Sequence, residues 1–257
     1  MKICVLIATH KPYWVPEDDV YLPVEAGRAL HEPRTPFLGD DTGENISGKN
    51  GAFCELTALY WAWKNLTDYD YLGLVHYRRH FARAGLRRSA QRVYTRRDFE
   101  RALAQAPVLL PRRRHYIIEK NASQYVHAHH ARDLTLLRES IAAHAPGDLP
   151  AFDAHMQARS THICNMFVMR RDLLDDYCHW LFTILFALEP RLDTTHYSTY
   201  DQRVYGFLAE RLLDVWLTTR GVPYQEASTV CLEPQHWGRK IARFLWRKFQ
   251  TQTQQES

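Results

Sequence analysis

The chain has 257 residues, of which 46% are hydrophobic, 24% charged and 12% aromatic. This composition is typical of a folded globular protein and excludes a disordered or fibrous chain. At this length a single core buries roughly 70 to 75% of the surface of the unfolded chain, so stability requires neither disulfides nor a structural metal. The five cysteines are scattered and contain no CxxC pair, which favours reduced thiols in a cytoplasmic protein.

The sequence offers no membrane span or secretory signal. The longest apolar run, from Trp180 to Leu188, is far shorter than the roughly 18 to 20 residues that a spanning helix requires. The short apolar stretch at the N-terminus is soon followed by polar residues and a proline, where a signal peptide would still be apolar. A buried first strand is the better interpretation.

The net charge of +4, from 33 basic and 29 acidic residues, hides an uneven distribution. The segment from Arg78 to Lys120 has 13 basic and three acidic residues, and the segment from Arg239 to Lys248 has five basic residues and no acidic one. Such zones indicate an anionic partner: the phosphates of a nucleotide, a membrane surface or a nucleic acid. Ordinary solvated surface charge is the alternative for about half of these residues.

Alternating short apolar runs and helical stretches predict an α/β fold. A first strand is expected over 2–8, followed by a loop-rich segment to about residue 50 that suits a lid facing substrate. One continuous helix is predicted over 51–66, opened by Asn50. A strand over 71–75 follows, and its carboxyl end is an edge that binds ligands in open α/β sheets. The polar residues at this edge are His76, Tyr77, Arg78 and Arg79.

The second half of the chain is richer in predicted helix. Thr95 and Asp98 have the spacing of a capping box, which starts a helix that extends to Ala106. Gly221 is expected to end a helix that begins near residue 200. The remaining expected elements are strands over 106–111 and 116–119, two or three helices between 123 and 155, and a buried strand turning into an amphipathic helix over 161–189.

Two clusters contain residue types that bind metals. An oxygen-rich loop contains Asp40, Asp41, Glu44 and Asn45, but its spacing is not that of a calcium-binding EF-hand, and a polar turn explains it equally well. The histidines at 127, 129 and 130 resemble metal ligands, yet no acid completes a zinc-binding helix motif. The glycine signatures of Rossmann dehydrogenases and P-loop kinases are absent from the sequence, which argues against both classes.

Four segments together resemble a known family. They are LGDDTGENISGKNGAFCELTALYWAWKNL (38–66), DYLGLVHYRRHF (70–81), CNMFVMRRDLLDDYCHWLF (164–182) and DQRVYGFLAERLLDVWL (201–217). In this order they are similar to the bacterial family first catalogued as a domain of unknown function (DUF4422 type) in capsule and exopolysaccharide clusters. Its members are glycosyltransferases, including galactofuranosyltransferases of O-antigen synthesis. The resemblance extends from Lys2 to about Leu217.

The resemblance implies a GT-A-like nucleotide-sugar fold, in which a central mixed sheet is flanked by helices. It places Thr9, His10 and Lys11, after the first strand, against uridine, although Thr9 also suits a simple turn cap. In place of the usual DxD metal motif the chain has His76, Tyr77, Arg78 and Arg79, which would face the departing diphosphate. The alternative for Arg78 and Arg79 is a pair of surface arginines beyond a strand.

The resemblance also implies an acceptor side. Asn165 and Met166 would lie nearest the sugar. Asp201 stands at a predicted helix N-terminus and is the first candidate for the catalytic base of an inverting transfer, with Asp41 and Glu210 as further candidates. A helix-terminal acid that stabilises the macrodipole is the alternative for Asp201. The expected substrate-binding set is completed by Asp40, Asn45, Asn50, His130, Gln202 and Arg203.

We therefore expect a cytoplasmic glycosyltransferase domain over 1–236 that moves a sugar, with galactofuranose the first candidate, from a UDP donor to a polysaccharide or lipid-linked acceptor. Mn²⁺ or Mg²⁺ is a candidate cofactor, but the sequence predicts no set of ligands for it. The alternatives are a nucleic-acid-binding protein that uses the arginine-rich segment and a metal-dependent hydrolase that uses the 127–130 histidines.

The remaining segment, 237–257, is expected to form a basic amphipathic helix with a frayed end. Its apolar residues recur at helical spacing among the five basic residues, a pattern that suits the anionic surface of the inner membrane. Packing on the domain is the alternative.

Overall fold

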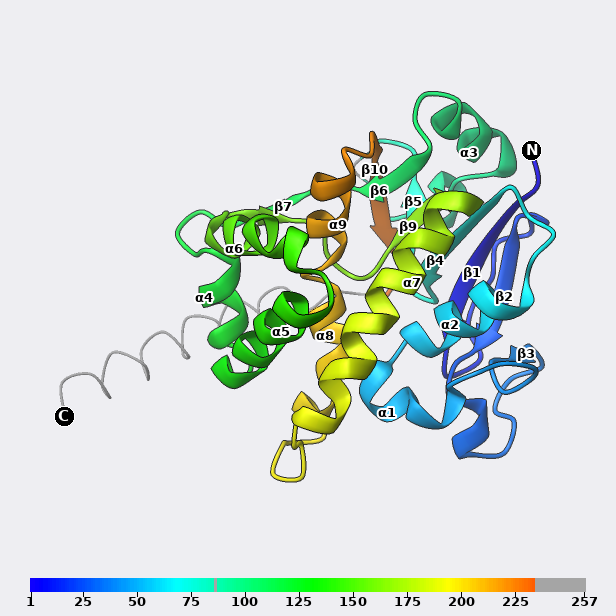
Figure 1. Cartoon of the computed structure of the whole chain (residues 1–257). Helices are drawn as coiled ribbons and strands as arrows, with labels where there is room; N and C mark the ends of the chain where they lie inside the picture. Colours follow the sequence, from blue (N-terminus) through cyan, green and yellow to red (C-terminus); the bar gives the residue numbers. More distant parts are fainter. Residues whose placement is uncertain (86, 234–257) are drawn as a thin grey trace.

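The computed structural model describes residues 1–85 and 87–233, and within them the chain forms a central mixed sheet flanked by helices (Figure 1). The order of strands in the main sheet is β3-β2-β1-β4-β5-β10-β6-β9. The strands of this sheet are β1 (Ile3–Thr9), β2 (Tyr21–Glu25), β3 (Leu38–Gly39), β4 (Tyr71–His76), β5 (Arg79–Ala82), β6 (Val108–Pro111), β9 (Phe167–Arg170) and β10 (Gln225–Cys231). A small separate ribbon pairs β7 (Arg114–His115) with β8 (Ser160–Thr161).

Most of the helical residues follow the middle of the chain. The helices are α1 (Asn50–Phe53), α2 (Leu56–Asn65), α3 (Arg96–Leu103), α4 (Asn121–Val126), α5 (Ala131–His144), α6 (Leu149–Gln157), α7 (Arg171–Leu188), α8 (Val204–Ala209) and α9 (Leu213–Arg220). A 3-10 turn, η6 (Asp201–Arg203), leads directly into α8. Among the described residues no helix is long and apolar enough to cross a membrane.

The first strand explains the layering. Its side chains alternate, so that Cys4, Leu6 and Ala8 pack in one hydrophobic cluster and Ile3, Val5 and Ile7 in another. The first cluster lies under α2, α5, α7, α8 and α9, and the second lies under α3. A strand that is buried on both faces reads as a continuous apolar run, which is why the sequence predicted it correctly.

Strands β1 and β4 set the position of the ligand-binding edge. They run parallel in register from Ile3 opposite Tyr71 to Ala8 opposite His76, so both carboxyl ends meet at one edge of the sheet. On its other side β4 pairs with two strands. Strand β9 pairs with the first four residues of β4, and β5 pairs with β4 only at His76. The chain thus turns sharply after His76 and returns along β5.

Several sequence predictions are confirmed by the structure. The first strand, the strand over 71–75, the strand within 106–111 and the helix started by the Thr95 and Asp98 capping box are all present. Three helices lie between residues 121 and 157, and Gly221 ends α9 in a left-handed conformation (φ 60°). The single helix predicted from about residue 200 to Gly221 is instead divided into η6, α8 and α9, with residues 210–212 between the two α-helices. The mixed sheet with flanking helices confirms the coarse fold class.

Other predictions were wrong, each for a physical reason. The segment predicted as a loop contains strand β2. Its central residue is Pro23, a residue type that is uncommon inside strands, and this proline lies opposite Ile7 of β1 in a parallel pair. The helix predicted over 51–66 is broken at Cys54 into α1 and α2. Residues 116–119 are not a strand, because Ile117 and Ile118 are exposed. Strands β5 and β10, which pair with each other, were missed because their pattern is set by partners distant in sequence.

The predicted tail helix over 237–250 lies outside the described residues, as does the domain boundary expected at residue 236.

Gly73 provides a test of the β4–β9 pairing. A Cβ atom at this position would lie 2.8 Å from the carbonyl oxygen of Phe167 and 2.6 Å from Cγ2 of Val168. We expect Gly73→Ala to lower the free energy of unfolding by about 1 to 3 kcal/mol, the usual effect of overpacking. Gly51→Ala is the matched control, since nothing lies within 4 Å of its Cβ position. Equal urea midpoints for the two variants would show that β9 does not pack against Gly73 as described.

Candidate functional site

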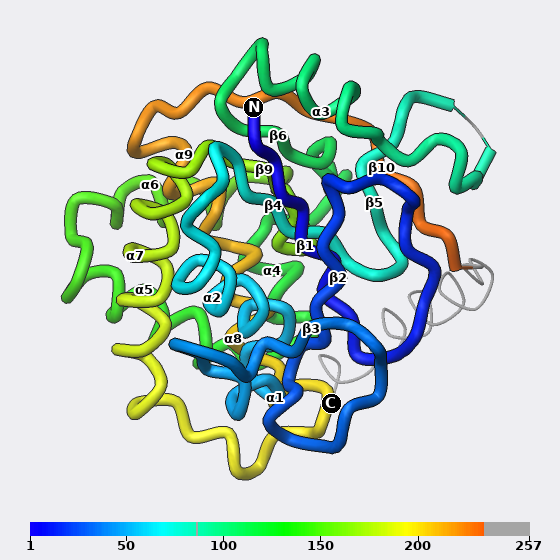
Figure 2. The backbone as a smooth tube through the Cα atoms, turned by 90° about the vertical axis from the view of Figure 1, so that its right-hand side faces the viewer, coloured from blue at the N-terminus to red at the C-terminus, as the bar shows by residue number. Residues whose placement is uncertain are grey.

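A cavity of about 480 Å³ opens at the carboxyl ends of β1 and β4. Figure 2 shows these strands side by side in the middle of the molecule, with α1 and α8 beyond their ends. The segments after both strands, the α1–α2 junction and η6 all contribute to the wall. The lining residues are Ala8, Thr9, His10, Ala26, Asn50, Gly51, Cys54, Glu55, His76, Tyr77, Arg78, Thr199 and Arg203.

A second cavity of about 260 Å³ adjoins the first. The two share Cys54, Glu55, His76, Arg78 and Arg203, so they form one continuous site. The second cavity adds Arg79, Cys164, Tyr200, Gly206, Phe207 and Glu210 to the wall. The site therefore has a chamber at the sheet edge and a second chamber against α8.

The backbone is strained where it forms this site. Among the described residues, those other than glycine with positive φ are Cys54 (52°), Cys164 (78°) and Asn165 (46°). Such conformations cost of order 1 to 3 kcal/mol each and persist where the surrounding structure holds them, often at functional sites. Cys54 and Cys164 line the cavity, and Asn165 bonds to a residue that does.

The break at Cys54 places Glu55 in the site. Helix α1 ends at Phe53, Cys54 has a positive φ of 52°, and α2 starts directly after Glu55. Asn50 supports the break, because its Nδ2 donates to the carbonyl oxygen of Cys54 at 2.7 Å. The carboxylate of Glu55 accepts a hydrogen bond from Nδ2 of Asn165 at 2.8 Å and lies 3.9 Å from Nε2 of His76. Glu55 was not predicted as a site residue, because its segment has the sequence pattern of one continuous helix.

His76 is fixed by the strained segment. Its Nε2 bonds to the carbonyl oxygen of Cys164, which requires a proton on that nitrogen. Arg79 lies against the sulfur of the same cysteine. The turn at residues 164–165 therefore connects β4 and β5 to the floor of the second chamber.

Positive side chains gather at the first chamber. Arg78 donates to one carboxylate oxygen of Glu233 at 3.1 Å, and Lys11 donates to the other at 3.2 Å. Arg203 enters from η6, with its guanidinium 5.3 Å from the ring centre of Phe207 and its Nε 3.2 Å from the sulfur of Cys54. An anion that enters this chamber would meet at least two guanidinium groups.

An aromatic and polar wall completes the first chamber. His10 packs edge-on against Tyr77, with ring centres 5.1 Å apart. Partial burial and the positive charges of Lys11, Arg78 and Arg203 lower the pKa of His10, so its ring is neutral near pH 7. Thr9 is buried, and its hydroxyl bonds to both backbone groups of Lys11, so it also caps the turn after β1.

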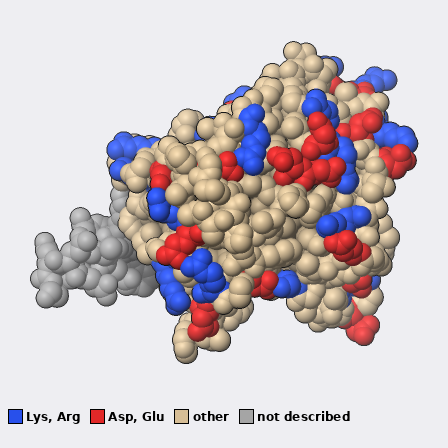
Figure 3. Space-filling view, viewed as in Figure 1, with Lys and Arg blue, Asp and Glu red and all other residues tan. Residues whose placement is uncertain are grey.

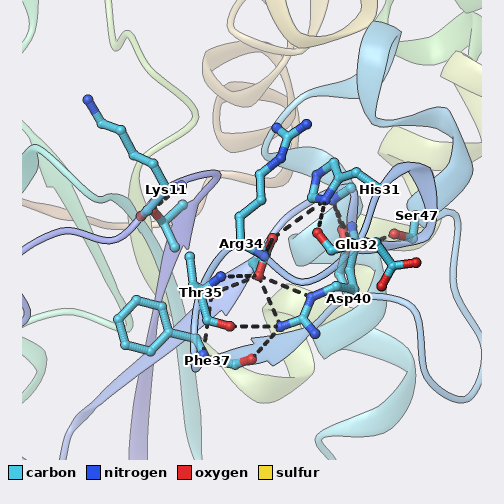
Figure 4. A network of polar contacts seen from close by, with 12 residues as sticks. Lys11, His31, Glu32, Arg34, Thr35, Phe37, Asp40 and Ser47 are labelled. Atoms are coloured by element: carbon cyan, nitrogen blue, oxygen red, sulfur yellow. Dashed lines mark hydrogen bonds and ion pairs between the residues drawn. The ribbon is translucent and has the colours of Figure 1, made fainter.

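Asp40 was predicted to bind substrate, but the structure gives it a different position. It is completely buried and accepts hydrogen bonds from the backbone N–H groups of Gly27 and Arg28 and from the hydroxyl of Ser47. The buried carboxylate of Glu25 likewise accepts hydrogen bonds from the backbone N–H groups of Arg34 and Thr35. Arg34, Thr35, Asp40 and Ser47 are labelled in Figure 4. These carboxylates fold the loop that ends at α1, and so they hold the wall of the cavity without lining it.

Other predicted residues also lie outside the lining. Asn45 forms a turn, in which its Oδ1 accepts from the backbone of Ser47, and Asp41 is exposed beside it in the same loop. Met166 is buried in the core beneath the sheet. Gln202 is exposed in η6 and bonds to the backbone of Tyr197.

Asp201 takes part in a polar and aromatic group next to the second chamber. Its carboxylate accepts from the hydroxyl of Ser198 at 2.6 Å and bonds to Nδ1 of His129 at 3.2 Å, and these bonds lower its pKa. His130 lies 4.0 Å from Asp201 and stacks on Tyr197. Neither Asp201 nor His130 is part of the cavity lining.

The described residues do not fit a metal held by protein side chains alone. No group of three or more His, Cys, Asp or Glu gathers among residues 1–85 and 87–233. In the 40–45 loop, Asp40 accepts from the backbone of residues 27 and 28, and Glu44 accepts from Tyr60. His127 pairs with Glu119, and His129 pairs with Asp201. Glu55 and His76 are two ligand-type side chains within the site. Metal use stays a prediction.

Comparison with known proteins identifies the family. A family model described as "Domain of unknown function (DUF4422)" matches residues 4–221. The chain belongs to this family. This confirms the resemblance seen in the sequence. No curated protein is a significant match in sequence.

One solved structure places the DUF4422 chain among known folds. That structure is the apo form of WbbM, a bifunctional glycosyltransferase, to which this chain is similar with a TM-score of 0.84 and 28% sequence identity. The match covers 91% of this chain and 46% of the WbbM chain. This chain therefore corresponds to less than half the length of WbbM.

Glu210 gives the site a dependence on pH that can be measured. Burial raises the pKa of Glu210 above its ordinary value of 4.5; Arg211 opposes the shift and Glu55 adds to it. The folded state therefore binds a proton that the unfolded state releases, so stability is lost as pH rises through the raised pKa. We expect Glu210→Gln to melt at a higher temperature than wild type at pH 8, with a smaller difference at pH 5. A difference that is independent of pH would show that Glu210 is ionised as easily in the folded protein as in solution.

Proposed function

We propose that this chain is a glycosyltransferase domain that transfers a sugar from a nucleotide-diphosphate donor to a glycan hydroxyl. The observation that carries the proposal is the continuous two-chamber site, in which guanidinium groups face carboxylates at the carboxyl ends of two parallel strands. Membership of the DUF4422 family and similarity to a glycosyltransferase structure support it.

The first chamber suits the nucleotide. Phosphate oxygens would bond to Arg78 and Arg203, which line both chambers, and to Arg79 from the adjoining second chamber. The planar guanidinium groups of these residues match phosphate geometry. The base and ribose would lie against Thr9, His10 and Tyr77 at the end of β1. In this arrangement the negative charge that develops on the departing diphosphate is stabilised by fixed positive charges, which is the main catalytic requirement of such a transfer.

An internal competitor for the phosphate lies beside the first chamber, where it bonds to Arg78 of the lining. Glu233 accepts from both Lys11 and Arg78. Its carboxylate compensates these cations in the free protein, and a diphosphate would have to displace it.

The second chamber suits the acceptor. Its carboxylates are Glu55 and Glu210, and Glu55 is held by Asn165 close to His76. We assign the general base to Glu55: it accepts the proton of the acceptor hydroxyl while the new C–O bond forms and the bond to the phosphate oxygen breaks. Glu210 is less suitable, since its raised pKa favours the neutral acid.

This assignment differs from the one that the sequence favoured. Asp201 accepts from Ser198 and pairs with His129 beside the chamber, so it would need to change partners before it reached a substrate. Asp41 lies on an exposed loop outside the lining. Glu55 requires neither rearrangement.

The finer assignments are proposals that rest on the family resemblance. They are a GT-A-like fold, a UDP donor, galactofuranose as the transferred sugar, inversion at the anomeric carbon, and a polysaccharide or lipid-linked acceptor in capsule, exopolysaccharide or O-antigen synthesis. A peripheral position at the cytoplasmic side of the inner membrane and use of Mn²⁺ or Mg²⁺ belong to the same set.

A thermal-shift experiment with UDP, with and without Mn²⁺, tests the proposed class. A ligand that binds only the folded state raises the melting temperature, and the rise grows with the logarithm of the ligand concentration above the dissociation constant. We expect UDP to stabilise the protein. Stabilisation by oligonucleotides alone would support the nucleic-acid-binding alternative, and stabilisation by metal alone would support the hydrolase alternative.

Arginine variants test the diphosphate contacts. We expect Arg78→Ala and Arg79→Ala each to lower UDP-sugar turnover by about tenfold to a hundredfold, since a charge-assisted hydrogen bond is worth about 1.5 to 3 kcal/mol. Arg97→Ala, on exposed α3 in the same arginine-rich segment, is the control and should keep full turnover. Urea unfolding should show little change for all three, and turnover within twofold of wild type would remove Arg78 and Arg79 from the site.

Carboxylate variants distinguish the two candidate bases. We expect Glu55→Gln to keep UDP binding and lose at least about 100-fold in transfer, the usual scale for a lost general base. Asp201→Asn should lose far less. The reverse order in initial-rate measurements would return the role of base to Asp201.

A further inference from the structure

The loop between β7 and α4 presents two adjacent isoleucines to solvent. Ile117 is 88% exposed and Ile118 is 64% exposed, the highest values among the large hydrophobic side chains of the described residues. The strand that the sequence predicted over 116–119 would have buried at least one of the two. Single exposed apolar residues are common, but two consecutive β-branched residues at a loop tip incur a cost in water that a partner would remove.

Basic side chains lie directly behind this tip. Arg159 donates to the carbonyl oxygen of Ile117, and its own carbonyl accepts from the backbone of Tyr116. Arg114 lies over the ring of Tyr116, 5.5 Å from its centre, and Lys120 follows the tip and bonds to Gln157. Arg114, Lys120 and Arg159 are all exposed. The one acid of the loop, Glu119, is bonded to His127.

The charge is local rather than general. On the face shown in Figure 3, acidic and basic side chains of the described residues are interspersed over most of the surface. At the β7–α4 loop the sequence Arg112 to Lys120 holds four basic residues and one acidic residue, and one of the four, Arg113, turns inward to pair with Asp214. Of the other three, Arg114 and Lys120 lie close to the isoleucines in the chain, and Arg159 joins them through its bond to Ile117.

We propose that the β7–α4 loop docks on an anionic phospholipid bilayer, with Ile117 and Ile118 entering the boundary between headgroups and acyl chains. Arg114, Lys120 and Arg159 then meet lipid phosphates. The order of the groups, apolar at the tip and cationic behind it, matches the order of hydrocarbon and phosphate layers in a membrane. A protein partner with an acidic rim is the competing occupant.

The loop is connected to the second chamber of the site. Strand β7 pairs with β8, with Arg114 opposite Thr161. From β8 the chain continues through His162 to Cys164, which lines that chamber. Docking would thus bring the acceptor side of the site near the lipid surface. Its use for a lipid-linked acceptor rests on the proposed function, whereas the docking itself does not.

Vesicle binding by the full chain tests the proposal. Co-sedimentation is measured with vesicles of 30% phosphatidylglycerol in phosphatidylcholine and with pure phosphatidylcholine at low salt. We expect binding to the anionic vesicles, and a loss of at least about tenfold for the double variant Ile117→Ser with Ile118→Ser. Val126→Ser, at an exposed valine of α4, is the matched control and should bind as wild type does.

The outcomes are separable from those of the proposed function. Melting curves with UDP on the same preparations show whether the double variant is folded and whether its nucleotide site is intact. Loss of vesicle binding with an unchanged UDP shift supports the docking loop. The proposal would be overturned if the wild-type protein did not bind anionic vesicles. It would also be overturned if the double variant bound them as the wild type does, and the vesicles would then be bound by segment 237–257 or another surface.

Discussion

The left-handed backbone at Cys54 is the constraint on which the site depends. It separates α1 from α2, turns Glu55 toward the cavity, and is stabilised by Asn50 and Thr57, which both donate to the Cys54 carbonyl oxygen. Gly206 of α8 allows the approach, since a Cβ there would lie only 3.3 Å from the Cys54 side chain. Replacing Cys54 by glycine would relieve the strain, but it would also free the segment that holds Glu55.

Basic and acidic side chains enter the site from different elements. Arg78 and Arg203 enter from the turn after β4 and from η6, whereas Glu55 and Glu210 enter from the helical side. Burial disfavours the charged form of Glu210. At a pH above the raised pKa of Glu210, the buried carboxylate therefore lowers the stability of the ligand-free protein. Such a cost is expected where a protein keeps charged groups available for a substrate.

The arginine-rich segment, which appeared uniform in sequence, divides into separate tasks. Arg78 and Arg79 belong to the site, Arg96 pairs with Asp19 on the surface, Arg113 pairs with buried Asp214, and Arg114 lies beside the exposed isoleucines. Composition predicted an anionic partner for the whole segment. Only the path of the chain, which reverses between β4 and β5 and again between β5 and β6, assigns each arginine to a location.

The sequence by itself determined the α/β class, the first and fourth strands, most helices, and the presence of polar residues where those strands end, because these follow from local periodicity and capping. It also placed Thr9, His10, His76 and Arg78 correctly at one edge. The tertiary structure alone decided that Glu55 enters the site and that Asp40 and Met166 do not line it. The break at Cys54, the burial of Asp40 among backbone N–H groups and the pairing of β5 with β10 all depend on contacts between segments far apart in the chain, which no local pattern records.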